Sequence, residues 1–336
     1  MKQLKLTFLL AVLMNMVGTK AFAYDAYIDG IYYNFSGSEA MVTYQEQYND
    51  NQNAYLGIVI IPESVIYEGK TYYVTSIGQQ AFSFCNGLTE VLIPNSVKTI
   101  KHEAFWCCSN LESIEIPNSV TSIEHSAFTG CSSLTSIEIP NSITSIPLNA
   151  FCNCTGLTSV VIPNSVRTIG VGAFSFCRNL KSINIGSGVT LIESNAFDHC
   201  DALTSVTIPN SLTSIETHAF AYCVALTSIT SFIEEPFVIE DYMFITNEAS
   251  INSVYEIATL YVPVGTINKY KACEGWKKFV NIVEMSTDID EVNTASDNNN
   301  HIITIYDATG REIKQMQNGF NIVKMSDGTV KKIIIK

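Results

Sequence analysis

The sequence predicts a β-rich solenoid in which about seven repeats of constant length stack as coils along a parallel sheet. The first observation behind this prediction is the dipeptide Ala-Phe, which recurs every 23 residues without insertion. The second is a cysteine three residues after each phenylalanine, followed by a leucine three residues later. The phenylalanines are Phe82, Phe105, Phe128, Phe151, Phe174, Phe197 and Phe220, and the cysteines are Cys85, Cys108, Cys131, Cys154, Cys177, Cys200 and Cys223. Such a period indicates a chain that buries its core by stacking each repeat on the next.

Each repeat divides into three legs. Residues 111–116 (LESIEI) alternate apolar and polar side chains, as a half-buried strand does. Pro117 ends this strand because proline cannot donate a ladder hydrogen bond. A second extended leg turns Val120 and Ile123 inward, and a third, beginning at Ser126, is predicted to be a short helical turn with its phenylalanine in the core. The segment L-x-x-I-x-I at this period is the pattern of a leucine-rich-repeat solenoid, a right-handed coil.

Residues 1–23 are predicted to be a cleaved secretory signal peptide. Lys2 and Lys5 provide a positive start, residues 6–17 are apolar, and residues 21–23 (Ala-Phe-Ala) form a cleavage site of small residues. The alternative is a membrane anchor, which needs about 20 apolar residues. No cysteine precedes Cys85, which argues against a lipoprotein. We therefore expect an exported protein, secreted or on the cell surface, that does not span a membrane.

The charge of the chain excludes one class of partner. The net charge is −13, and loss of the three signal-peptide lysines would lower it to −16. Nucleic acid is not expected as a partner, because phosphate binding needs clustered cations. The charge is also uneven, since residues 300–336 carry +3 and the rest of the mature chain −19.

Residues 24–72 are predicted to form an N-terminal β cap. Ten of the sixteen tyrosines lie between Tyr24 and Tyr73, among short β-branched and aromatic runs separated by turn residues. We expect short antiparallel strands that cover the apolar core and the unpaired strand edge of the first coil. A carbohydrate platform built from the tyrosines is the alternative.

The repeat consensus L-x-x-I-x-I-P-x-S-V-x-x-I-x-x-x-A-F-x-x-C resembles the BspA-like, Treponema-type leucine-rich repeats of bacterial surface proteins, over about residues 58–285. Residues 260–265 (LYVPVG), with Tyr270 and Trp276 after them, resemble the closing unit of such arrays, in which a last strand and a short helix cover the final coil. The solenoid with this closing cap is therefore expected to span residues 73–285. The resemblance implies a curved solenoid, export, and adhesion or host-protein binding in some members, with no catalytic chemistry.

The remaining residues are predicted to form a linker and a small domain. Residues 286–299 are polar and acidic, as linkers are, and residues 300–336 read as a C-terminal β-unit of three strands. This unit resembles the sorting domains of Bacteroidetes type IX secretion: residues 305–311 (IYDATGR) match one motif, whereas residues 319–323 (GFNIV) depart from the G-x-Y-I-V motif. The resemblance implies secretion or attachment machinery as a partner. The alternative is a plain β-module that blunts the end of the molecule.

The cysteines and histidines predict neither disulfides nor a metal site. Seven cysteines share one column, where parallel side chains have poor geometry for bridging, so we expect a buried thiol ladder in a small apolar slot. The other close cysteines, at 107–108 and 152–154, lack zinc-ribbon spacing. His102 and His125 occupy one column and should be neighbours on adjacent coils, but no third ligand is visible. No cofactor is predicted.

No catalytic motif is present in the sequence. It lacks G-x-S-x-G, a Walker loop, H-E-x-x-H and an EF-hand loop. The abundant serines are explained by corners and strand faces. We therefore predict no enzymatic activity, and a hydrolase hidden in the caps is the weakest alternative.

The outward face of the strands is the candidate binding surface. Most of its positions are Thr or Ser, which is typical of a solvated face, but four glutamates lie close together in the early coils. These predicted ligand-binding residues are Glu90, Glu112, Glu115 and Glu138. Stacked carboxylates repel one another, so a cation or a basic partner would stabilise them. A solvated acidic face without a ligand is the alternative.

The opposite side of the coil carries aromatic residues beside the cysteine column, which are predicted to pack as a convex surface rather than to bind: Phe84, Trp106, Phe176 and Tyr222. The function that fits these features best is protein or glycan binding, or adhesion, without catalysis. The expected partner is a protein or glycan on host or neighbouring cells. The alternative is a structural envelope component without a specific ligand.

Overall fold

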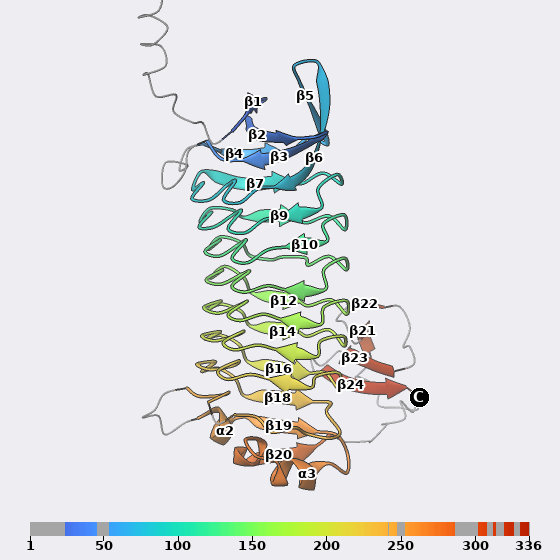
Figure 1. Cartoon of the computed structure of the whole chain (residues 1–336). Helices are drawn as coiled ribbons and strands as arrows, with labels where there is room; N and C mark the ends of the chain where they lie inside the picture. Colours follow the sequence, from blue (N-terminus) through green and yellow to red (C-terminus); the bar gives the residue numbers. More distant parts are fainter. Residues whose placement is uncertain are drawn as a thin grey trace, which may run out of the picture.

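The computed structural model describes residues 24–45, 54–240, 242–246 and 253–285, and the backbone of four strands between residues 302 and 335. The predicted signal peptide and the predicted linker lie outside the described residues. Figure 1 shows a long coil whose turns stack from one end to the other, with a row of short strands along it. The predicted β-solenoid is confirmed. No helix in the described part of the chain is long and apolar enough to cross a membrane.

The strands of the first leg form one side of the coil, which we call the front sheet. They are β4 (Gly57–Ile60), β7 (Leu88–Leu92), β9 (Ser113–Glu115), β12 (Ser159–Val161), β14 (Ser182–Asn184), β16 (Ser205–Ile208), β18 (Ser228–Ser231), β19 (Thr259–Val262) and β20 (Asn281–Glu284). Hydrogen bonds join β4-β7-β9 and β12-β14-β16-β18-β19-β20, all in parallel. Between these groups Glu138 makes an isolated parallel bridge to Val161. The front sheet therefore extends beyond the seven regular repeats at both ends.

The second leg forms a parallel back sheet. Its strands are β6 (Lys70–Ile77), β8 (Thr99–Ile100), β10 (Ser122–Ile123), β11 (Ser145–Ile146), β13 (Thr168–Ile169), β15 (Leu191–Ile192) and β17 (Ser214–Ile215). All but β6 are two residues long, with the second residue buried. In register, Thr168 pairs with Leu191 and Ile169 with Ile192, so that each residue lies opposite its equivalent in the next repeat.

The third leg is not helical, so that expectation was wrong. The N–H group of Trp106 donates to the carbonyl of Glu103 in the same coil, at 3.0 Å, whereas that of Phe105 donates to Ala127 of the next coil, at 2.8 Å. Glu103 and Cys107 both have positive φ angles, of 55° and 56°, and equivalent positions repeat this in the other coils. Left-handed residues on either side of each phenylalanine interrupt a helix. Alternate N–H groups are thereby free to join neighbouring coils.

The core is a stack of phenylalanine rings bordered by the cysteines. From Phe82 to Phe220, consecutive ring centroids lie 5.0–5.5 Å apart with interplanar angles of 4–14°. The thiol of Cys131 donates to the carbonyl of Phe105 in the preceding coil, at 3.2 Å, and the same bond recurs from Cys108 to Cys223. The predicted thiol ladder is confirmed. The slot of the ladder is not purely apolar, because each thiol from Cys108 onward donates to a backbone carbonyl.

The N-terminal strands extend the back sheet. β1 (Ala26–Ile28), β2 (Ile31–Ser36) and β3 (Glu39–Thr43) pair antiparallel, as expected, and β5 (Ser64–Tyr67) forms a hairpin with β6. β3 then pairs in parallel with β6. Tyr55 closes the top of the core: its ring lies 4.6 Å from that of Phe82, and its hydroxyl accepts from the N–H group of Tyr32 and donates to the carbonyl of Thr43.

Short helices close the other end of the coil. They are α2 (Val254–Ile257), α3 (Ile267–Ala272) and the 3-10 helix η2 (Trp276–Lys278). Tyr270 and Trp276 are fully buried, and their side chains donate to the carbonyls of Ile233 and Phe237 at 2.8 and 2.9 Å. The last strand and short helix expected from the family resemblance are therefore present.

Near the C-terminus, the backbone forms a separate antiparallel sheet in the order β22-β21-β23-β24. Its strands are β21 (Ile302–Asp307), β22 (Glu312–Ile313), β23 (Gly319–Met325) and β24 (Val330–Ile335). Three of them are the strands expected from the sequence, and β22 is an addition. Their relation to a sorting domain stays a prediction.

Candidate binding surface

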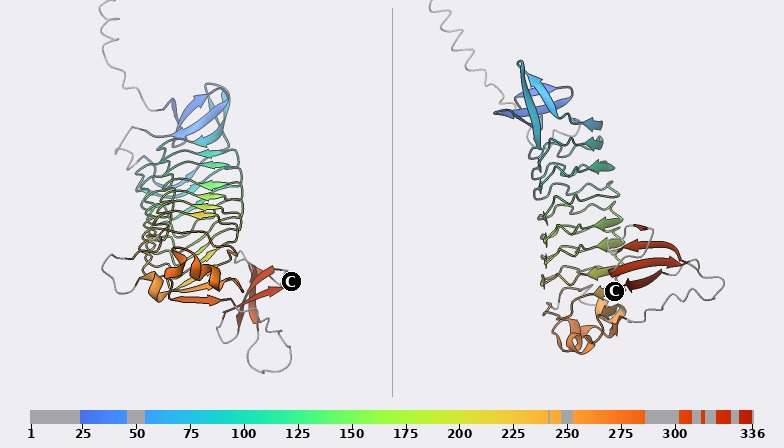
Figure 2. Two further views of the ribbon diagram at one scale, coloured as in Figure 1. Left: turned by 60° about the horizontal axis from the view of Figure 1, so that its bottom comes forward. Right: turned by 90° about the vertical axis from the view of Figure 1, so that its right-hand side faces the viewer.

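The outward face of the front sheet is a regular array of hydroxyl groups over most of its length. In the register of the sheet, Ser159, Ser182, Ser205 and Ser228 lie side by side on β12, β14, β16 and β18. Their inward neighbours, such as Val160 and Ile183, are buried. The alternation of side chains along each strand thus separates an aliphatic core from a face with almost no charge. Figure 2 shows the front strands aligned along one side of the coil.

The four predicted glutamates all lie near the N-terminal end of this face. Glu115 and Glu138 are exposed and occupy the same position in adjacent coils. Glu90 is half-buried and pairs in register with Ser113, and the exposed Glu112 immediately precedes β9. The structure therefore brings the four to one end of the face, but it places them in three columns rather than in one.

The carboxylates of these glutamates are available to a partner. None of the four carboxylates makes a hydrogen bond or ion pair with another residue that the structure describes. The described residues also contain no group of three or more acidic, histidine or cysteine side chains that could hold a metal ion. A basic surface, rather than a single coordinated cation, is the chemistry that suits carboxylates spread over several strands.

An exposed aliphatic cluster, which was not predicted from the sequence, lies beside the glutamates. Leu56, Ile58, Ile60 and Leu92 have 61%, 60%, 67% and 40% of their surface exposed. In the register of the sheet Ile58 lies opposite Glu90, and Ile60 lies opposite Leu92. The sequence pattern that indicates this cluster is the apolar run of residues 57–61 (GIVII). Side chains alternate between the two faces of a strand, so every second residue of such a run must point outward. We call these four residues the aliphatic cluster.

The corner between the second and third legs carries the predicted histidine pair. The rings of His102 and His125 stack with centroids 4.8 Å apart and an interplanar angle of 19°, so the expected proximity is confirmed. The Nδ1 atom of His102 lies 3.4 Å from a carboxylate oxygen of Glu124. A single carboxylate and two stacked imidazoles form a polar corner, because stacked rings do not converge on one point.

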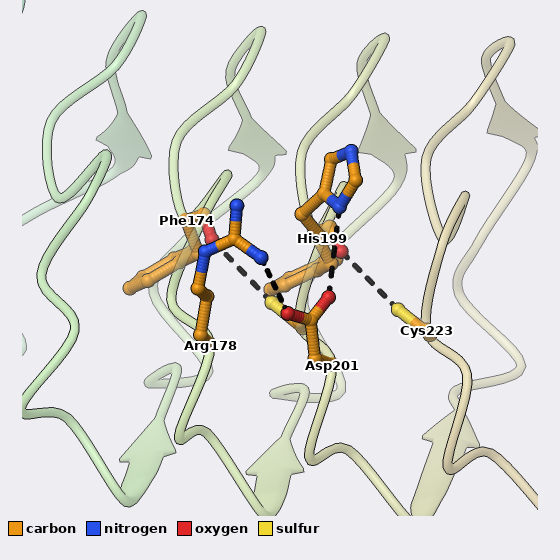
Figure 3. A network of polar contacts seen from close by, with 7 residues as sticks. Phe174, Arg178, His199, Asp201 and Cys223 are labelled. Carbon is orange, nitrogen blue, oxygen red and sulfur yellow. Dashed lines mark hydrogen bonds and ion pairs between the residues drawn. The ribbon is translucent and has the colours of Figure 1, made fainter.

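A cluster of polar and aromatic residues lies next to the cysteine column, at positions adjacent to Cys177, Cys200 and Cys223 in the sequence. Arg178 and Asp201 form an ion pair at 2.7 Å, and His199 Nδ1 lies 3.6 Å from the other oxygen of Asp201 (Figure 3). The ring of His199 stacks between those of Phe176 and Tyr222, at 4.7 and 4.4 Å. Both faces of the His199 ring are therefore covered, and the guanidinium of Arg178 lies 5.3 Å from the centroid of the Phe176 ring. The prediction that these aromatic residues pack rather than bind is consistent with this geometry.

One carboxyl group near this cluster is unusual. Burial raises the pKa of Asp198, and the neighbouring His199 and His218 oppose that effect. Its Oδ1 atom is buried and has no hydrogen-bond partner among the described residues. Asp198 occupies the position of Ser175 in the preceding coil, where a small hydroxyl is easily accommodated. The residue at this position varies among the coils, and burial at Asp198 destabilises the ionised form of its carboxyl group.

The sequence matches one family model. The model of the BspA type leucine-rich repeat region matches residues 63–170 and 144–262, in six copies. A comparison with curated proteins finds no match.

Several solved structures have a similar fold. A leucine-rich cell-surface protein of Faecalibacterium prausnitzii A2-165 has a TM-score of 0.54 and 28% identity, covering 77% of this chain and 72% of that one. A leucine-rich-repeat protein of Bacteroides ovatus ATCC 8483 has a TM-score of 0.50 and 26% identity, covering 78% and 77%. The leucine-rich-repeat protein of T. pallidum has a TM-score of 0.50 and 28% identity, covering 60% and 90%.

Proposed function

Because the chain belongs to the BspA-type leucine-rich-repeat family, we propose that it is an exported surface or secreted protein that binds a protein partner and catalyses no reaction. Membership suggests protein binding, and the similar protein of F. prausnitzii is described as a cell-surface protein. The proposed biological role is adhesion to host or neighbouring cells. A long sheet with a rigid core is suited to this role, because its face is held in place before a partner arrives.

The observation that carries the proposal is the contrast along the front face. Four carboxylates without described partners lie at one end of a face that is otherwise built mainly from hydroxyl groups. Glu90, Glu112, Glu115 and Glu138 are therefore the proposed binding residues. Their charge favours a basic protein surface, which would relieve the repulsion between them and accelerate association.

The test is a binding screen of residues 24–336 on arrays of host glycoproteins and glycans. Specific protein binding should weaken about tenfold in the double variant Glu112→Lys/Glu115→Lys, since attraction becomes repulsion at two positions. The matched control is Thr204→Lys/Thr207→Lys, which adds lysines at the same two positions of a later coil. Equal effects of the two variants would remove the acidic site from the proposal. The absence of any specific ligand would favour a structural envelope component.

The C-terminal unit has a separate proposed role, in sorting or surface attachment. The support is the resemblance of residues 305–311 to a motif of type IX sorting domains. Deletion of residues 300–336 should move the protein from the cell surface to the periplasm, as measured by cell fractionation. Unchanged surface display after the deletion would contradict this role and leave the binding proposal intact.

A further inference from the structure

Within the described residues, the front sheet begins with β4, which has a strand neighbour on only one side. β4 pairs in parallel with β7, and no strand among the described residues pairs with its other edge. The N-terminal strands β1, β2 and β3 continue the back sheet instead. In the right-hand view of Figure 2, the front sheet runs along the right-hand side of the coil with β4 at its top, and the strands of the cap lie to the left of β4.

The backbone of β4 offers hydrogen-bonding groups toward this free edge. The N–H group of Gly57 donates to the carbonyl of Gly87, just before β7, at 2.7 Å. The N–H group of Ile61, just after β4, donates to the carbonyl of Leu92 at 3.1 Å. Because backbone groups alternate in direction along a strand, the N–H and C=O groups of Ile58 and Ile60 point to the other side. The pairing of β4 shifts register between Gly57 and Ile58, and from Ile58 onward the free edge presents the hydrogen-bonding pattern that each front strand presents to the next.

The side chains of β4 do not protect this edge. Soluble proteins commonly shield exposed edge strands with lysines, prolines or charges that point inward. Ile58 and Ile60 are instead mostly exposed, and the strand itself contains no charged residue. An exposed, aliphatic and unpaired edge of this kind is suited to accept an additional strand.

The charges beside β4 indicate the chemistry of that strand. Glu90 lies opposite Ile58, one strand away from β4, and Glu115 lies opposite Leu92, two strands away. Strands in a sheet are about 4.8 Å apart, so a lysine or arginine on an added strand could reach Glu90. The aliphatic stem of the same side chain would cover Ile58 or Ile60.

We propose that β4 is the docking edge for an extended segment of a partner protein, which adds to the front sheet and carries lysine or arginine at alternate positions. This inference rests on the proposed function, because it states how a basic partner would meet the acidic end of the front face. The aliphatic cluster supplies the apolar contact, the edge of β4 supplies the backbone hydrogen bonds, and the glutamates select the charge.

The probe for this proposal is an eight-residue peptide of alternating lysine and valine, capped at both ends and labelled for fluorescence anisotropy. It is titrated into residues 24–336 and into the variant Ile60→Pro. Proline removes the outward N–H group and is tolerated on edge strands. We expect affinity to fall about tenfold or more in Ile60→Pro, and much less in the matched control Ile60→Ala, which keeps that N–H group.

Two changes in the peptide test the same contacts without altering the protein. Methylation of alternate backbone nitrogens should abolish binding, since it removes the donors that pair with β4. Replacement of the lysines by glutamates should also abolish it, because the added charges would face Glu90. Equal binding by the methylated and unmodified peptides, or no binding by the lysine peptide, would overturn strand addition.

The results also separate this inference from the proposed function. If Glu112→Lys/Glu115→Lys weakens the peptide but Ile60→Pro and backbone methylation do not, the acidic surface stands and strand addition is overturned. If the protein associates with itself in sedimentation velocity and Ile60→Pro abolishes that association, the occupant is a second copy of the chain, and the assignment to a partner protein is overturned.

Discussion

The front and back sheets of this coil begin in different ways. The back sheet continues from β6 into the antiparallel strands of the cap, whereas the front sheet stops at β4. Both sheets share one core, which Tyr55 closes by packing on Phe82. The difference shows that a fold can cover its apolar core without pairing the edge strand of each sheet. A hydrated strand edge is compatible with a stable fold, whereas an open stack of phenylalanine rings would leave a large apolar area in water.

The largest expected effect on stability comes from removing the side chain of Tyr55, which covers the end of the core. Tyr55→Ala should destabilise the protein by about 3–5 kcal/mol, the usual loss for a large buried aromatic side chain. Tyr55→Phe should cost about 1–3 kcal/mol, because it leaves the buried N–H group of Tyr32 and carbonyl of Thr43 without their partner. Urea unfolding followed by circular dichroism measures both values.

The control for this prediction is a residue of β4, the edge strand of the front sheet. Ile58→Ala changes an exposed side chain, so its effect on stability should stay within about 0.5 kcal/mol. A loss for Ile58→Ala as large as that for Tyr55→Ala would show that β4 is buried in solution and would contradict the comparison of the two sheets.

The second prediction compares the first coil with an interior coil. Cys131 donates to the carbonyl of Phe105 at 3.2 Å, whereas the thiol of Cys85 lies 3.9 Å from the carbonyl of Ser83. Both thiols also interact with a backbone group that precedes them, that of Tyr55 for Cys85 and that of Cys108 for Cys131. Because the bonds to the carbonyls are what differ, Cys131→Ala should cost about 1–3 kcal/mol and Cys85→Ala about 1 kcal/mol less. Thermal unfolding of the two variants measures the difference. The reverse order would show that the carbonyl bond does not explain the cysteine column.

The smallest expected effect concerns Asp198, in the middle of the coil, where both sheets continue on either side. Burial raises its folded-state pKa, so the ionised carboxylate lowers stability. This penalty is absent below the unfolded pKa of about 4, grows as the pH rises through the folded pKa, and is complete above it. Asp198→Asn should therefore stabilise the protein at pH 7, by about 0.5 kcal/mol after allowance for solvent screening.

The measurement is the melting temperature of both proteins between pH 3 and pH 8. The curves should converge at low pH and separate as the pH rises. A gain for Asp198→Asn that is constant over this range would exclude the titration of this carboxyl group as its cause.

Much of the interior could be predicted from the sequence, because its pattern is local and repeated. The constant period of the repeat placed the phenylalanines and cysteines in columns, and the structure stacks the rings at 5.0–5.5 Å and bonds each thiol from Cys108 onward to the coil before it. The conformation of the third leg was not predicted, because its left-handed residues are of many types, including Glu103, Ser126 and His199. No residue type therefore indicates that conformation. Only hydrogen bonds to the next coil stabilise that conformation.

The candidate site was predicted in part. The glutamates could be found because they interrupt a run of Thr and Ser, but their arrangement in three columns depends on the register between β7 and β9. Ile58 and Ile60 precede the first regular repeat, so the sequence predicts that they belong to the cap. Nothing in their immediate neighbourhood shows whether a strand covers them.

The sequence by itself determined the repeating coil of this protein: alternation within each strand separates buried from exposed side chains, and a constant period brings equivalent residues together. The tertiary structure decided which sheet the cap would continue. That choice depends on the pairing of Glu39 with Tyr73 and of Val42 with Ile77, which lie far apart in the chain. A local pattern cannot specify such a pairing, because it depends on how the whole cap packs over Tyr55 and the first ring of the core.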